Sequence, residues 1–127
     1  MARTNAPVPT ARADLGGRAE ALAVEYLARQ GLVLVARNFR TRRGEIDVIA
    51  RDRDTLVFVE VRLRSRAAYG GAAASITPAK RARLIKAAHA YLATLAREPA
   101  CRFDAILLDG LDPARISWER NILDSGD

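Results

Sequence analysis

Two short apolar runs decide the fold of this chain, Gly44-Glu45-Ile46-Asp47-Val48-Ile49 and Leu56-Val57-Phe58-Val59-Glu60-Val61-Arg62, and each contains an acidic residue in its interior. Both runs are rich in β-branched residues, and the polar sequence Arg51-Asp52-Arg53-Asp54 separates them. This composition is typical of two strands joined by a tight turn. The stretch therefore predicts a β-hairpin with an acid on each strand.

The relative position of the two acids depends on the register of the hairpin. If residue 50 pairs with residue 55, Asp47 lies opposite Phe58, and Glu60 lies one diagonal further along the same face. Side chains on diagonal positions are about 7–8 Å apart, close enough for two carboxylates to share a divalent cation. A slip of one residue would place the acids on opposite faces. We expect Asp47 and Glu60 to be neighbours and candidate ligands of Mg²⁺ or Mn²⁺.

Two explanations remain open for these acids. A carboxylate within an apolar strand costs several kcal/mol unless its charge is compensated. Mg²⁺ is one compensation, because one or two carboxylates usually hold it while waters and substrate phosphate complete its shell. Ion pairs with Arg62 and other guanidinium groups are the second, since structural ion-pair networks perturb carboxylates as active sites do.

The chain has 127 residues, enough for one domain with a packed core, and 50% of them are hydrophobic. Its formal net charge of +6 indicates an acidic partner, and nucleic acid is the leading candidate. The arginines gather around the hairpin, which favours a phosphate-binding surface, although a solvated arginine-rich surface has the same composition. The candidate nucleic-acid contacts are Arg40, Arg42, Arg43, Arg64, Arg66, Lys80 and Arg83.

The cysteine content and the lengths of the apolar runs narrow the expected cellular location and the kind of metal that the chain could bind. Cys101 is the single cysteine, so no internal disulfide is possible and a reducing cytoplasm is the expected location. One cysteine and one histidine also make zinc a poor candidate. No run approaches the roughly 18 apolar residues of a membrane span, and we expect no membrane partner. Residues 1–13 lack the apolar core of a signal peptide and are expected to form a disordered tail.

The spacing of apolar residues predicts a first helix of about 16 residues, with Asp14 as its cap and Gly31 at its end. Glu20 lies at the margin of the apolar stripe, about 100° from its centre, where it either faces the sheet or stays solvated. Residues 32–40 predict a strand, so three strands follow one another as a meander. Gly44 is expected to supply the backbone freedom for the turn before the acids.

A long loop separates this meander from a second helix. Residues 63–76 have no usable period and contain two adjacent glycines, which predicts the loop. Thr77-Pro78 predicts a helix start, with threonine as the N-cap and proline in the first turn. The apolar stripe that follows predicts a helix to about Arg97.

Two more strands are predicted near the C-terminus. Residues 102–108 predict a buried strand, central or parallel to an inner neighbour, with Asp104 at its entrance. Residues 116–118 predict a short edge strand. We therefore expect a single domain over residues 14–123 and a frayed end at residues 124–127.

Several short segments, taken together and in order, form a pattern that is specific enough to indicate a protein family. They are Gly17-Arg18-Ala19-Glu20 with Ala23 and Tyr26-Leu27, Arg37-Asn38-Phe39-Arg40, Gly44-Glu45-Ile46-Asp47, Leu56-Val57-Phe58-Val59-Glu60-Val61, Lys80, Tyr91-Leu92 and Arg102-Phe103-Asp104. On these segments the chain resembles the small bacterial proteins of the UPF0102 (YraN-like) family, described as related to Holliday-junction resolvases. More broadly, the order of elements and the two acids resemble the restriction-endonuclease-like superfamily, whose motif is Asp followed by Glu-x-Lys on the next strand. The resemblance implies an α/β fold with an αβββαβ core, a mixed central sheet flanked by helices, and nucleic-acid binding.

Carried over residue by residue, the resemblance implies that Asp47 and Glu60 are metal ligands and that Glu20 completes or orients the site. Where the superfamily has Glu-x-Lys, this chain has Glu60-Val61-Arg62. Arginine can stabilise charge on a scissile phosphate, but it stays protonated and cannot act as a base. Lys80, at the start of the second helix, could supply the missing amine. The candidate catalytic residues are thus Glu20, Asp47, Glu60, Arg62 and Lys80.

Three functions remain open at this point. The first is an endonuclease that hydrolyses phosphodiester bonds, on branched DNA by resemblance, with Mg²⁺ or Mn²⁺ held by Asp47 and Glu60. The second is a nucleic-acid-binding module of the same fold that has lost turnover through the replacement of lysine by Arg62. The third is a basic adaptor that docks on a protein partner through the loop around Tyr69. Junction resolvases generally work as dimers, so the resemblance also implies a homodimer.

Overall fold

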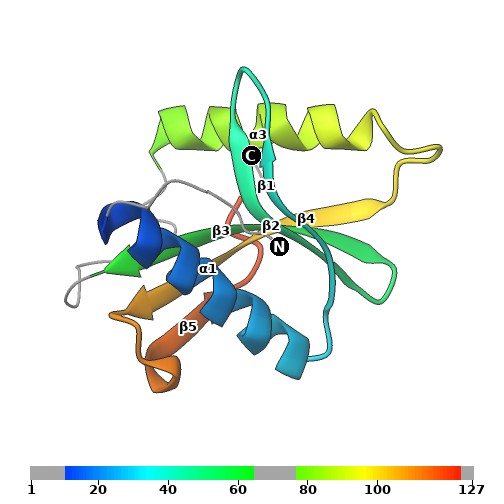
Figure 1. Cartoon of the computed structure of the whole chain (residues 1–127). Helices are drawn as coiled ribbons and strands as arrows, with labels where there is room; N and C mark the ends of the chain where they lie inside the picture. The colour runs from blue at the N-terminus through cyan, green and yellow to red at the C-terminus, as the bar shows by residue number, and fades with distance from the viewer. Residues whose placement is uncertain (1–10, 65–76, 124–127) are drawn as a thin grey trace, which may run out of the picture.

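A computed structural model of the chain describes residues 11–64 and 77–123 (Figure 1). Its elements are α1 (Ala11–Arg29), β1 (Val33–Arg40), β2 (Glu45–Asp52), β3 (Thr55–Arg64), α3 (Pro78–Leu92), β4 (Ala100–Asp109), the short 3-10 helix η1 (Pro113–Arg115) and β5 (Ile116–Glu119). The predicted order of helix, three strands, helix and strand is confirmed, as is the short last strand. Most of the tail, the loop and the frayed end predicted from sequence fall at residues 1–10, 65–76 and 124–127, outside the described residues.

The five strands form one mixed sheet in the order β1-β2-β3-β4-β5. Neighbouring strands are antiparallel except β3 and β4, which are parallel, as predicted for a strand beside an inner neighbour. Parallel neighbours need a crossover, and α3 lies in the connection between them. Figure 1 shows α1 and α3 on opposite sides of the sheet. This is the expected α/β architecture, and it is compatible with a restriction-endonuclease-like core.

Alternating side chains of the sheet build a core on each face. Val57 and Val59 of β3 belong to the apolar cluster that packs against α1. Phe58, between them, belongs to the cluster that contains Leu84 of α3. Because successive strand residues point to opposite faces, Glu60, two residues after Phe58, emerges on the side of α3.

The hairpin register differs from the prediction by two residues. Ala50 pairs with Val57 rather than with residue 55, so the turn between β2 and β3 contains only two residues. The first of them, Arg53, has a φ of 58°, a left-handed conformation that glycine or asparagine usually supplies in such turns. The sequence therefore carried no signal for a turn this short. Continued beyond its last pair, the register sets Asp47 opposite Glu60, and a shift of two residues keeps them on one face.

The first helix starts earlier than its sequence predicted. α1 begins at Ala11, so Asp14 lies inside the helix instead of capping it. Alanine and arginine are strong helix formers, which explains why the helix extends through these positions. Its end is as predicted, because Gly31 follows the last turn with a φ of 95°.

The second described helix starts where predicted and ends sooner. The hydroxyl of Thr77 accepts the backbone N–H of Lys80 at 3.2 Å, which confirms the N-cap. The helix ends at Leu92, before residue 97, because the N–H of Leu95 bonds the carbonyl of Leu92 at 3.0 Å in a tighter turn. No helix of the described part of the chain is long and apolar enough to cross a membrane.

Asp104 has a structural role in the interior of the sheet. β4 begins four residues before it, so the acid lies inside the strand rather than at its entrance, and it is fully buried. Its carboxylate accepts hydrogen bonds from Nε of Arg102, Nε1 of Trp118 and the backbone N–H of Asn121, each at 3.0 Å. Several donors offset the cost of burying a charge. Asp104 therefore fastens β5 and the segment after it to β4.

Gly44 is required by packing and not, as predicted, by the conformation of the turn. Its φ is not in the left-handed region. A Cβ at this position would overlap the backbone carbonyl of Arg83 in α3, and Figure 1 shows the turn between β1 and β2 rising beside α3. The hydroxyl of Thr41 closes this turn by accepting the backbone N–H groups of Arg43 and Gly44, both at 3.1 Å. The bare backbone of Gly44 lets the turn touch the half of α3 that carries Lys80 and Arg83.

We predict that Gly44→Ala lowers the free energy of unfolding by about 1–3 kcal/mol, because the added methyl must displace the backbone of α3. Urea denaturation followed by circular dichroism measures the change. Gly17→Ala is the matched control: it lies in α1 with open space around the new Cβ, so it should stabilise the chain by about 0.5–1 kcal/mol. A neutral or stabilising Gly44→Ala would show that the contact with Arg83 is loose.

Candidate functional site

Asp47 lies where β2 and β3 stop pairing. The paired residues of the two strands end at Val48 and Val59. Beyond them, Oδ2 of Asp47 accepts the backbone N–H of Val61 at 2.8 Å. The carboxylate thus takes the place of a strand partner for Val61, and this hydrogen bond fixes it beside Glu60.

The surroundings of Asp47 disfavour its charged form. Burial, the largest cause, and the nearby carboxylate of Glu60 raise the pKa of Asp47 from 3.8 to about 7. The hydrogen bond from Val61 lowers the pKa, while the carboxylates of Glu20 and Glu45 raise it further. Three carboxylates, from α1, β2 and β3, therefore act on Asp47 and disfavour its ionisation.

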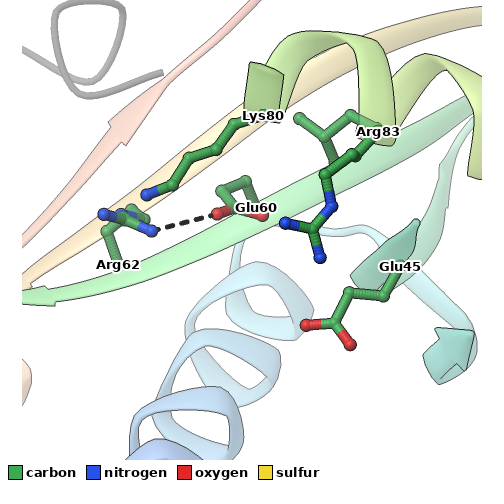
Figure 2. A pocket seen from close by; sticks show the side chains of 6 residues that line it. Glu45, Glu60, Arg62, Lys80 and Arg83 are labelled. Atoms are coloured by element: carbon green, nitrogen blue, oxygen red, sulfur yellow. Dashed lines mark hydrogen bonds and ion pairs between the residues drawn. The ribbon is translucent and has the colours of Figure 1, made fainter. Parts of the chain in front are cut away.

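Glu60 faces a pocket under the first half of α3. The pocket has a volume of about 140 Å³, and it is lined by Glu45, Glu60, Arg62, Lys80, Arg83 and Leu84. Figure 2 shows Lys80 reaching down from α3 toward Arg62, and the guanidinium of Arg83 between Glu60 and Glu45. Three cations and two carboxylates thus line one pocket.

The ion-pair explanation offered for the paired acids applies to Glu60. Glu60 forms an ion pair with Arg62, with 3.4 Å between Oε2 and Nη1 (Figure 2). For Asp47 the structure shows the hydrogen bond from Val61 and, within the described residues, no ion pair. Arginine therefore compensates Glu60, whereas no side-chain cation among residues 11–64 and 77–123 pairs with Asp47.

Glu20 points into the protein instead of toward solvent. Its side chain is 15% exposed and pairs with Arg37 of β1, with 3.5 Å between Oε1 and Nη2. Glu20 lies close enough to Asp47 for its carboxylate to raise the pKa of Asp47. The structure therefore brings Glu20 to the edge of the site, although it does not line the pocket beside Glu60.

The candidate nucleic-acid contacts do not all gather at the pocket. Lys80 and Arg83 line it, whereas Arg40 is 70% exposed and pairs with Glu45 at 3.3 Å. Arg42 and Arg43 are exposed in the turn that touches α3. The side chain of Arg64, and Arg66 as a whole, lie outside the described residues.

Glu45 is the pocket residue that sequence reasoning missed. It belongs to the same quoted stretch as Asp47, two positions earlier on β2, so period-2 alternation could have placed both on one face. Its position at the very start of the strand concealed it, since the apolar run begins only at Ile46. Glu45 both lines the pocket and contributes to the raised pKa of Asp47.

The donors at this site fit a hard divalent cation. Within residues 11–64 and 77–123 no group of three or more His, Cys, Asp or Glu side chains has the geometry of a metal site. Mg²⁺ needs fewer protein ligands, because water and phosphate oxygens complete its octahedron. Asp47 and Glu60 supply two carboxylates. His89 and Cys101 line another cavity, near the C-terminal end of α3, so no soft ligand competes at the acids.

We predict that Asp47 makes the chain less stable as pH rises. In metal-free buffer the pKa of Asp47 is 3.8 in the unfolded chain and about 7 in the folded chain. Asp47 therefore stabilises the fold most at low pH and progressively less as the pH rises to about 7. Relative to Asp47→Asn, which retains an acceptor for Val61, the free energy of unfolding of the wild type should fall by on the order of 2 kcal/mol between pH 4 and pH 8.

Urea denaturation of both proteins in EDTA across this range measures the difference. Adding Mg²⁺ at pH 8 should raise the unfolding midpoint of the wild type and leave that of Asp47→Asn unchanged. Identical pH profiles for the two proteins would mean that Asp47 is already ionised at low pH.

Comparison with known proteins places the chain in a family. The model of the family described as "Uncharacterised protein family UPF0102" matches residues 19–108, a range that includes Glu20, Asp47, Glu60, Arg62 and Lys80. The UPF0102 protein of Herminiimonas arsenicoxydans is 50% identical over 116 residues, which cover 91% of this chain and 91% of the relative. The UPF0102 protein of Cupriavidus metallidurans is 55% identical over 112 residues, which cover 87% of this chain and 81% of the relative. The UPF0102 protein of Methylobacillus flagellatus is 56% identical over 105 residues, which cover 83% of this chain and 92% of the relative. The chain therefore belongs to the UPF0102 family.

Proposed function

We propose that this protein binds nucleic acid and hydrolyses phosphodiester bonds with the help of Mg²⁺ or Mn²⁺. The observation that carries the proposal is the juxtaposition at the end of the β2–β3 ladder. Asp47 is held beside Glu60 with no ion-pair partner in the part of the chain that the structure describes, while Arg62, Lys80 and Arg83 face the adjoining pocket. Carboxylates for a metal next to cations for a phosphate are the two requirements of such a hydrolase.

Asp47 and Glu60 would hold the cation. The raised pKa of Asp47 means that metal binding must displace a proton at neutral pH, so affinity for the cation should increase with pH up to about 7. A bound divalent cation supplies Lewis-acid polarisation of a phosphoryl oxygen and activates water as a nucleophile. The hydrogen bond from Val61 orients Asp47 for this role before any ligand arrives.

Arg62 and Lys80 would neutralise the phosphate. The guanidinium of Arg62 is anchored by Glu60 at 3.4 Å, and the amine of Lys80 points toward it from α3 (Figure 2). Two cations that converge at one end of a pocket repel each other, so an anion between them is favourable. Arginine binds phosphate through two parallel donors and does not release its proton. In this chain, Lys80 is the amine closest to the role of the lysine in the Glu-x-Lys motif.

The basic surface extends from the pocket along the turn between β1 and β2. Arg42 and Arg43 are exposed on this turn, and Gly44 packs it against Arg83. The contact joins the cations of the turn to those of α3 in one region. A phosphate backbone running over the turn and the start of α3 would meet them in succession.

A second candidate is a nucleic-acid-binding module without turnover. The ion pair between Glu60 and Arg62 favours it, because arginine already offsets one of the two carboxylates that would hold the cation. Such a protein keeps the phosphate-binding cations of the pocket and the turn. The third function considered above, an adaptor docking through Tyr69, depends on a segment outside the described residues, so no observation favours it.

We predict that the wild type cleaves at least one of four substrates, branched, duplex or single-stranded DNA or RNA, in Mg²⁺ or Mn²⁺. Asp47→Asn and Glu60→Gln should each lower the rate at least about 100-fold, as expected when transition-state electrostatics are removed. Glu25→Gln is the matched control, because it removes an exposed carboxylate of α1 and should leave the rate unchanged. Gel assays with labelled substrates measure the rates.

The variant Arg62→Lys distinguishes the two candidates. Cleavage by the wild type that is lost in Asp47→Asn supports the hydrolase. Binding without cleavage by the wild type, with cleavage gained in Arg62→Lys, supports the module that has lost turnover. Absence of both binding and cleavage for all four substrates contradicts the proposed function.

We also predict that binding of duplex DNA in EDTA weakens steeply with salt. If Arg43, Arg62, Lys80 and Arg83 contact phosphates, the slope of log affinity against log salt should be about −3 to −4. Arg83→Ala should reduce that slope by about one unit. Arg97→Ala removes an exposed arginine beyond the far end of α3 and should leave it unchanged. Fluorescence anisotropy at several salt concentrations measures the slope, and a flat dependence would exclude phosphate contacts.

A further inference from the structure

The two edges of the sheet are protected to different degrees. β5, at one edge, has four residues, and the guanidinium of Arg120 lies 4.0 Å from the ring centre of its Trp118. Short strands and covering charges are the usual protection of an edge. β1, at the other edge, has eight residues, and its Val33, Leu34 and Val35 are 50%, 46% and 37% exposed. We call these three residues the β1 apolar edge.

The β1 apolar edge has no protection of its own among the described residues. Leu32-Val33-Leu34-Val35-Ala36 contains no charge and no proline, the composition that promotes pairing with another strand. The pairing of β1 with β2 shifts by one residue between Leu34 and Ala36, which leaves Val35 without a partner on β2. Such a bulge often shields an edge. Here the extra residue is itself apolar and exposed, so it enlarges the apolar surface.

The charges along β1 are neutralised within the chain. Arg37 pairs with Glu20 at 3.5 Å and Arg40 with Glu45 at 3.3 Å, and these arginines are the charged residues of the strand. The edge is therefore close to neutral in a chain whose formal net charge is +6. A neutral apolar edge suits an apolar partner, and it does not suit the polyanion proposed for the pocket.

We propose that two copies of this chain associate through the β1 apolar edge, antiparallel and related by a two-fold axis near Leu34. A two-fold interface brings a patch against itself. In this arrangement Val33 of each copy faces Val35 of the other, and Leu32 faces Ala36, so apolar residues meet throughout. Arg37 of one copy then faces Gly31 of the other. A parallel arrangement would instead set Arg37 against Arg37.

Sedimentation velocity of the full chain, without nucleic acid, over about 1–200 μM tests the association independently of the proposed function. The wild type should show a concentration-dependent dimer. Val33→Lys should weaken dimerisation at least about tenfold, because it places a charge at the interface. The control Ile85→Lys removes an apolar residue that is 36% exposed on α3 and should leave dimerisation unchanged. A wild type that stays monomeric, or a Val33→Lys variant that dimerises as the wild type does, overturns the proposal.

A cross-linking variant tests the antiparallel geometry. Residues facing each other across antiparallel strands have Cα atoms about 4.5–5.5 Å apart, within the range of a disulfide. Leu34→Cys, in a Cys101→Ser background, should therefore form a covalent dimer on mild oxidation, and Ile85→Cys in the same background should not. Failure of Leu34→Cys to cross-link, or equal cross-linking of both variants, contradicts the two-fold arrangement about Leu34.

Discussion

The hydrogen bond from the backbone of Val61 to Asp47 is the constraint on which the site depends. It lies where the β2–β3 ladder ends, so a side chain continues the connection between two strands whose backbones have stopped pairing. The same bond fixes Asp47 beside Glu60 and makes their mutual repulsion unavoidable. Burial and that repulsion raise the pKa of Asp47 to about 7. When Asp47 is ionised, this raised pKa is a cost in the free energy of folding.

Local sequence signals were sufficient to predict the elements and their order. Apolar periodicity located both helices and the strands, and Thr77 marked the start of α3 correctly. The hairpin register was wrong by two residues because Arg53 adopts a left-handed conformation without the glycine or asparagine that normally signals it. The proximity of Asp47 and Glu60 was nevertheless predicted correctly, since a shift of two residues preserves the face of a strand.

Contacts between distant segments could not be predicted. The sequence correctly indicated that Gly44 is special, but it attributed the glycine to turn conformation. The actual reason is the backbone of Arg83, some forty positions away. Likewise, the sequence offered a metal or an ion pair for both acids, whereas the structure pairs Glu60 with Arg62 and leaves Asp47 with a backbone donor. The pair between Glu60 and Arg62 is local, because the two residues lie two positions apart on β3. The long-range feature is that Asp47 accepts the backbone N–H of Val61 where β2 and β3 stop pairing, and no local pattern encodes that end of the ladder.

The charged residues of this protein are balanced differently along β1 and around the pocket. On β1 the arginines are matched one for one by carboxylates of α1 and β2, so that edge is neutral and exposes apolar side chains. At the pocket, Arg62, Lys80 and Arg83 outnumber Glu45 and Glu60. Glu45 connects the two regions, because it pairs with Arg40, lines the pocket and raises the pKa of Asp47. The net charge of +6 therefore supports the polyanionic partner proposed above at the face that carries the pocket. It carries no such implication for the β1 apolar edge, where ion pairs balance both arginines and a proposed second copy would meet apolar side chains.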